Sequence, residues 1–149
     1  MSISKRSGDM ANASLTRRVT FSAAHRYRRP DWSDEQNVRI FGGSANAHYH
    51  GHSYRCDVTV SGPVDPDTGM VIDLGLLDRA LSIEVKQRFD QRNINKEVPE
   101  FNEGMLIPTG ENLARFIAER VQQAIGDVAR VSRVVLAEDD GLWAEFPAR

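Results

Sequence analysis

Three of the four histidines in this chain lie close together, at positions 48, 50 and 52. The segment 47–61 is rich in β-compatible residues and predicts a strand, in which alternate side chains share one face. At a rise of about 3.3 Å per residue, His50 and His52 can reach one metal ion, whereas His48 is about 13 Å from His52. A third imidazole must come from elsewhere, and only His25 remains. The sequence therefore predicts a metal site made of His25, His50 and His52.

Three imidazoles with an open fourth position are the ligand pattern of catalytic zinc, so Zn²⁺ is the expected cofactor. The alternative is a set of scattered surface histidines. Zinc is favoured because all four histidines fall in two segments and the single cysteine offers no competing cluster. An unrelated zinc hydrolase would need a Glu or Asp beside the histidines, as in HExxH, and the sequence has none there.

The composition sets the broad class of the protein. With 149 residues and 40% hydrophobic residues, one soluble domain over 14–149 is expected, preceded by a flexible N-terminal tail over 1–13. A net charge of −2 argues against nucleic acid as a partner. The lone Cys56 fits a reducing compartment, and the chain lacks both an apolar leader and a run of about 20 apolar residues. We therefore expect a cytoplasmic protein with no membrane partner.

Periodicity and turn residues predict the order β-β-α-α-β-β. The expected elements are a strand over 14–25, a long loop over 26–45, a strand over 47–61, a helix over 74–89 capped by Asp73, an irregular stretch over 90–107, a helix capped by Thr109 that ends near 125, a strand over 128–138, a hairpin turn at 139–141 and a strand over 142–146. This order favours an α+β fold, with a four-stranded antiparallel sheet and both helices on one face. An apolar opposite face could not be left in water, so a homo-oligomer is expected to bury it.

Several motifs, in order and spacing, carry a family resemblance. They are Phe21–Arg26, Ser33–Asn37 through Phe41–Gly42, His50–Tyr54, Thr68–Val71, Pro108–Asn112 and Glu138. Together these segments, which span nearly the whole chain beyond residue 18, resemble the 6-pyruvoyl-tetrahydropterin synthase family, which includes the carboxy-tetrahydropterin synthase of queuosine biosynthesis. The resemblance implies the tunnelling fold (T-fold), in which subunits pair sheet edges into a barrel and stack into a hexamer, a dimer of trimers.

The resemblance also implies a site. It places zinc on the same three histidines and a pterin substrate beside them, with Glu138 anchoring the pterin ring. Thr109, Gly110 and Glu111 belong to the same substrate site, and Gly110 stands where the family usually has a hydroxyl residue. A carboxylate can accept two parallel N–H bonds from an aminopyrimidinone, as it does from arginine. Judged by the adjacent residues in the sequence alone, Glu138 would be an exposed acid beside a hairpin turn. Its role in anchoring the pterin ring therefore rests on the resemblance.

The chain departs from the family pattern at two catalytic positions. The family's usual chemistry implies a proton-abstracting cysteine before the HGH motif, where this chain has Ser44, and an Asp-His pair that reads Asp90-Gln91 here. A serine hydroxyl needs a strong neighbouring base to act as a cysteine thiolate does, and an amide cannot shuttle protons. Ser44 and Asp90 remain candidate catalytic residues, with Asp90 orienting or charge-stabilising a base.

Another residue could supply the missing base. His48 is the surplus imidazole, and its ordinary pKa near 6.5 suits a general acid or base, although a solvated loop histidine is an equally good interpretation. Tyr49 is a second candidate that would point to the other face of a regular strand. Cys56 is better interpreted as a small buried core thiol.

Two functions remain open. The first is a zinc-dependent enzyme acting on a dihydroneopterin (triphosphate) type of substrate, by elimination and rearrangement or by cleavage of the side chain. The second is a family member that binds a pterin but has lost or changed the lyase reaction. The three histidines and Glu138 are expected in both, whereas Ser44 and Gln91 favour the second.

Overall fold

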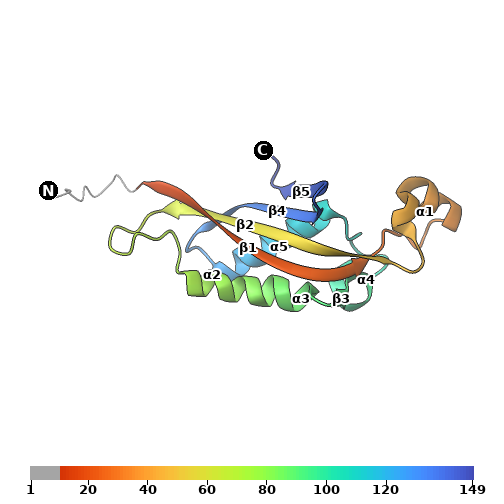
Figure 1. Ribbon diagram of the computed structural model, residues 1–149, viewed down its shortest axis with the longest axis horizontal. Helices are drawn as coiled ribbons and strands as arrows, with labels where there is room; N and C mark the ends of the chain where they lie inside the picture. The colour runs from red at the N-terminus through yellow and green to blue at the C-terminus, as the bar shows by residue number, and fades with distance from the viewer. Residues whose placement is uncertain (1–10) are drawn as a thin grey trace.

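Two long antiparallel strands form the centre of the computed structural model, which describes residues 11–149. Strand β1 (Asn12–His25) pairs with β2 (His50–Pro63) along its whole length. Strand β4 (Arg130–Asp139) pairs with β2, and β5 (Leu142–Phe146) pairs with β4, both antiparallel. The predicted α+β class and the four antiparallel strands are confirmed (Figure 1).

A fifth strand was not predicted. Strand β3 (Arg92–Asn93) runs parallel to β1 opposite Ala23 and Ala24, which gives the strand order β3-β1-β2-β4-β5. A two-residue strand has no hydrophobic period that a sequence pattern could reveal. It matters here because it follows Asp90 and Gln91 directly and fixes that segment to the sheet edge.

The ends of the first two strands differ from the prediction. Strand β1 includes Asn12 and Ala13, which were assigned to the tail, and residues 1–10 of that tail lie outside the described residues. Strand β2 begins at His50 and not at position 47. Tyr49 has a φ of 64°, which extended backbone does not allow, so His48 lies in a turn before the strand. The prediction that His48 shares a strand face with His50 was wrong.

The predicted loop over 26–45 contains a helix. Helix α1 (Asp34–Phe41) begins at Ser33, whose hydroxyl accepts a hydrogen bond from the Gln36 N–H, and a 3₁₀ turn (Gly42–Ala45) follows it. Figure 1 shows α1 at one end of the molecule, away from the other long helices. Asn37 is the one buried residue of α1. The helix was missed because it has no apolar stripe.

The two predicted long helices are present. Helix α2 (Leu74–Leu81), a π-helical turn (Ser82–Lys86) and α3 (Gln87–Phe89) together make one segment, capped by Asp73. Helix α5 (Gly110–Ile125) is capped by Thr109, which accepts from the Asn112 N–H. Between them lie the short α4 (Ile94–Glu97) and a 3₁₀ turn (Pro99–Phe101). No helix within residues 11–149 is long and apolar enough to cross a membrane.

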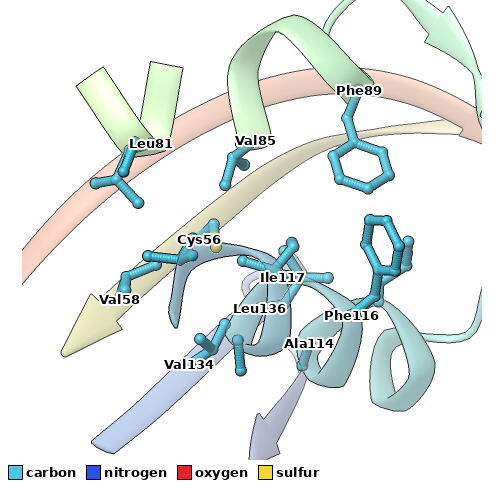
Figure 2. Packing of buried hydrophobic residues seen from close by; sticks show 14 of the residues in the cluster. Cys56, Val58, Leu81, Val85, Phe89, Ala114, Phe116, Ile117, Val134 and Leu136 are labelled. Atoms are coloured by element: carbon cyan, nitrogen blue, oxygen red, sulfur yellow. The ribbon is translucent and has the colours of Figure 1, made fainter. Parts of the chain in front are cut away.

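Both long helical segments cover one face of the sheet. Figure 2 shows Val85 and Phe89 from the first segment facing Ile117 and Phe116 of α5, with Cys56 of β2 at their side. Cys56 is fully buried, and burial raises the pKa of its thiol to about 12. Its interpretation as a core thiol is therefore confirmed.

The opposite face of the sheet is polar along β1 and β2, whereas Val135, Ala137 and the exposed Trp143 lie on it where β4 pairs with β5. Thr16 and Thr59 share a hydrogen bond of 2.7 Å across β1 and β2, and Arg18 binds both carboxylate oxygens of Asp57. The sequence argument for an oligomer assumed that this face would be apolar, and that premise was wrong for β1 and β2. The threonines and ion pairs of β1 and β2 can face water without a cover.

Candidate metal and ligand site

The three predicted metal ligands meet where β1 ends and β2 begins. His25 is the last residue of β1 and lies opposite His50, the first residue of β2. His52 follows on the same, helix-facing side of β2. The candidate ligand atoms of the three side chains all lie within 4.8 Å of one another. The structure thus brings together the three histidines that the spacing selected.

This donor set fits a zinc ion. Three nitrogens that bind zinc at 2.0–2.1 Å lie about 3.3 Å apart, so small side-chain movements would close the cluster around an ion. The Nε2 atom of His52 is buried and has no hydrogen-bond partner among the described residues. A buried nitrogen without a partner is costly, and coordination to a cation would satisfy it.

His25 is prepared to act as a neutral ligand. Its Nδ1 atom lies 2.8 Å from the main-chain oxygen of Pro108. A carbonyl oxygen only accepts, so Nδ1 carries the proton and Nε2 keeps its lone pair. The hydroxyl of Tyr54 lies 3.3 Å from this Nε2 atom and can donate to it. Burial, with smaller contributions from the charges of His50 and His52, lowers the pKa of His25 to about 4. Neutral imidazole is the form that binds metals, so His25 needs no deprotonation at neutral pH.

Glu138 is buried beside this cluster and is not the exposed acid that its neighbours suggested. Strand β4 continues through Asp139, so Glu138 keeps the alternation and faces the helices, with only 7% of the residue exposed. Its Oε2 atom lies 3.6 Å from Nε2 of His52. Its Oε1 atom accepts a 3.2 Å hydrogen bond from the hydroxyl of Tyr27.

The start of α5 borders the carboxylate. Gly110, the first residue of the helix, is buried, and a Cβ placed there would lie 3.9 Å from Oε1 of Glu138 and 3.3 Å from Cβ of Ala144. The positive end of the helix dipole favours a negative charge at this place. Thr109 uses its hydroxyl as the helix cap, and Glu111 is exposed. The structure therefore places the predicted 109–111 segment next to Glu138.

An open cavity of about 750 Å³ joins several candidate residues. His52 and Glu138 line it together with Asp90 and Gln91, which arrive from the loop after α3. Asp90 accepts a hydrogen bond from the Ser22 N–H at 2.9 Å, and its other oxygen lies 3.7 Å from the ammonium group of Lys86. The sequence analysis did not select Lys86, although its spacing of four residues before Asp90 on a helix is a signal for an ion pair.

Other candidates lie outside this cavity wall. Ser44 accepts a hydrogen bond from the Tyr27 N–H through its main-chain oxygen, and its side chain does not line the cavity. His48 is exposed, and its main-chain N–H donates to the side-chain oxygen of Asn46. The charged groups of Arg26 and Lys96 lie 4.7 and 5.0 Å from the centre of the Tyr49 ring. Within the described chain, none of the three side chains joins the histidine cluster.

The sequence analysis also missed Tyr27. Its ring lies edge-on to His25, with the centres 5.2 Å apart. Burial and the charge of Glu138 raise the pKa of its hydroxyl, so Tyr27 stays protonated and donates to Glu138. Its position two residues after His25, which continues the alternation of β1, is the signal that could have identified it.

Comparisons with known proteins point to one family. Residues 14–149 match the family model described as 6-pyruvoyl tetrahydropterin synthase. The 6-pyruvoyl tetrahydrobiopterin synthase of Pongo abelii is 37% identical over 133 residues, covering 89% of this chain and 90% of that protein. The human protein of the same name is 37% identical over 118 residues, covering 79% and 80%.

The fold agrees as well. The solved structure of 6-pyruvoyl tetrahydropterin synthase from Caenorhabditis elegans superposes with a TM-score of 0.87 at 31% identity, covering 94% of this chain and 98% of that one. The described domain therefore has the T-fold. Because the family model covers residues 14–149 and these relatives match most of their own length, the chain belongs to the 6-pyruvoyl tetrahydropterin synthase family.

Proposed function

We propose that this protein is a zinc-dependent lyase of pterin metabolism that acts on the side chain of a dihydroneopterin type of substrate, such as the triphosphate. The observation that carries the proposal is the pairing of the buried carboxylate Glu138 with the three imidazoles, across a distance of 3.6 Å between Glu138 and His52. The names of the relatives support pterin metabolism. The reaction would eliminate and rearrange, or cleave, the substrate side chain.

Glu138 would bind the ring end of the substrate. A carboxylate can accept two parallel N–H bonds from the 2-amino-4-oxo edge of a pterin. Burial makes such charged hydrogen bonds stronger than they would be in water. Among the described residues, the one hydrogen bond to this carboxylate comes from Tyr27, so most of its acceptor sites are free for a ligand.

His25, His50 and His52 would hold zinc at the side-chain end. When bound, zinc would polarise a substrate carbonyl and lower the pKa of a neighbouring hydroxyl. Asp90 lines the same cavity as His52 and is held by the Ser22 N–H, so it is placed to orient or charge-stabilise a base. His52 and Glu138 line the same cavity, whereas His25 and His50 do not.

The second candidate function is pterin binding with a lost or changed lyase reaction. Gln91 lies in the cavity wall where a proton-transferring histidine would be needed, and its amide cannot take that role. Ser44 does not line the cavity. Both observations favour a changed reaction over the family's usual one.

Product analysis separates the two candidates. Zinc-loaded protein is incubated with dihydroneopterin triphosphate and magnesium, and the products are identified by liquid chromatography and mass spectrometry beside a His50→Ala control. A new pterin that is absent in the control supports the enzyme, and its mass names the reaction. Unchanged substrate that nevertheless binds to the protein supports the second candidate.

A His48→Ala variant in the same assay tests the replacement base. If product forms at the wild-type rate in this variant, His48 is not the base. If product formation is lost while zinc content and substrate binding persist, His48 takes part in proton transfer.

We also propose that the chain assembles into a closed homo-oligomer, a hexamer built as a dimer of trimers. Strand β5 pairs with β4 alone, and β1 pairs with β3 only at Ala23 and Ala24, so both outer edges of the described sheet offer free main-chain groups. Large apolar side chains are exposed on α1 and nearby loops, including Val38, Ile40, Met105 and Leu106. Light scattering after size-exclusion chromatography measures the mass; a monomer at micromolar concentration would contradict the proposal.

A further inference from the structure

Tyr27 connects the two halves of the candidate site. Its ring lies edge-on to His25, with planes at 81°, and its hydroxyl donates to Oε1 of Glu138 at 3.2 Å. One side chain therefore contacts both a candidate metal ligand and the candidate ring-binding carboxylate.

Tyr27 is held on several sides. Its main-chain N–H donates to the oxygen of Ser44 at 2.8 Å, and its ring also lies edge-on to Phe41, with centres 5.9 Å apart. A side chain fixed in this way can hold a second group in place, because it does not itself rotate freely.

Glu138 needs such a group. The terminal torsion of a glutamate is broad, so the plane of a free carboxylate rotates easily. Two parallel N–H bonds from a ligand require that this plane be fixed. The nearby Nε2 of His52 lies 3.6 Å from Oε2 and makes no hydrogen bond. Within residues 11–149, the Tyr27 hydroxyl is the group that holds the carboxylate.

Tyr27 itself does not line the open cavity, whereas Glu138 does. A ligand in the cavity would meet the carboxylate, with the tyrosine behind it. Any effect of the Tyr27 hydroxyl on a ligand would therefore pass through Glu138.

We infer that Tyr27 is a positioning residue, whose hydroxyl fixes the plane of the Glu138 carboxylate and so determines the preference for 2-aminopteridines over pteridines that lack this amino group. The inference rests on the proposed function, because it assumes that Glu138 receives the ring edge of a pterin. It adds that the site distinguishes ligands by their 2-amino group, and that Tyr27 is responsible for this distinction.

The test uses two probes that differ at one position. Neopterin carries the 2-amino group, and the corresponding lumazine carries an oxygen there. Binding of each probe to the zinc-loaded full chain is measured by calorimetric titration for wild type, Tyr27→Phe, Glu138→Gln and Tyr54→Phe. Tyr54→Phe is the control, because it removes the same atom from a buried tyrosine whose hydroxyl lies 3.2 and 3.3 Å from the two ring nitrogens of His25 and, within residues 11–149, makes no hydrogen bond to Glu138.

In Tyr27→Phe we expect neopterin to bind about tenfold more weakly, with lumazine binding, zinc content and the thermal midpoint unchanged. Glu138→Gln should lose the preference for neopterin, and Tyr54→Phe should keep it. If Tyr27→Phe keeps the wild-type preference while Glu138→Gln loses it, the inference fails and the proposed function stands. If Tyr27→Phe weakens both probes equally or loses zinc, Tyr27 has only a structural role and the inference fails. If wild type shows no preference for neopterin, both the inference and the role of Glu138 fail.

Discussion

The Nδ1 atom of His25 lies 2.8 Å from the main-chain oxygen of Pro108, and this contact ties the end of β1 to the start of α5. The same helix start borders Glu138 through Gly110. One packing contact between helix and sheet therefore orients a candidate metal ligand and borders the carboxylate that lies next to it. The site depends on the docking of α5 onto the sheet.

Removal of one imidazole should abolish tight metal binding. In His50→Ala, two of the three candidate ligands remain, and we expect zinc affinity to fall by more than about 100-fold, since changes outside the first ligand shell already cost 10–100-fold. Equilibrium dialysis with elemental analysis measures the loss. His48→Ala is the matched control, because His48 is exposed and lies outside the cluster. Equal zinc binding by the two variants would contradict the assigned ligand set.

The metal-free protein should lose stability in mild acid. Burial lowers the pKa of His25 to about 4, whereas the unfolded chain takes up this proton near the ordinary value of 6.5. The stabilisation is complete above pH 6.5 and is lost as the pH falls from 6.5 toward 4, because the unfolded state then binds more protons. We expect a loss of about 2–3 kcal/mol from this group, measured by urea unfolding at pH 7 and pH 4.5.

A His25→Gln variant is the control for this pH dependence. If it still folds, its stability should fall less over the same pH range, because the buried group that titrates is gone. A variant with the full wild-type pH dependence would show that another group is responsible.

Asn95 should support the metal end of the site from behind. Its side-chain oxygen accepts from the Arg26 N–H at 2.8 Å, and its amide donates to the Arg26 oxygen at 3.0 Å, directly after His25. Asn95→Ala leaves both main-chain groups unpaired and should cost about 2–3 kcal/mol in the free energy of unfolding. Urea unfolding measures this cost. The exposed Asn102→Ala should change stability by less than about 0.5 kcal/mol, and equal effects would refute the role of Asn95.

The loss of the family's catalytic histidine can be tested by restoring a histidine at position 91. Gln91→His supplies a proton-transferring group in the cavity wall, and product formation from dihydroneopterin triphosphate should rise by at least about 100-fold. Gln91 has a φ of 60°, a conformation that histidine and asparagine tolerate better than most residues. Gln91→Asn is therefore the matched control and should add no activity. An unchanged rate in Gln91→His would mean that this position does not limit the reaction.

Much of the site could be predicted from the sequence. The ligand set followed from strand geometry, because a rise of about 3.3 Å per residue separates histidines that can share an ion from those that cannot. The helix over 110–125 and its Thr109 cap followed from a regular apolar stripe. The family followed from motifs in fixed order. These features depend on local spacing, which the sequence carries directly.

Tertiary structure decided the rest. Tyr49 has a positive φ, so His48 lies before the strand and not in it. A hydrophobic pattern in the sequence does not reveal such a backbone angle. Glu138 is buried because helices cover its side of the sheet, and Tyr27 reaches it from 111 positions away in the chain. The sequence by itself determined which residue types could bind a metal and a pterin. Only the folded chain determined which side chains lie within 4 Å of each other, because that depends on how α5 packs against β1, β2 and β4.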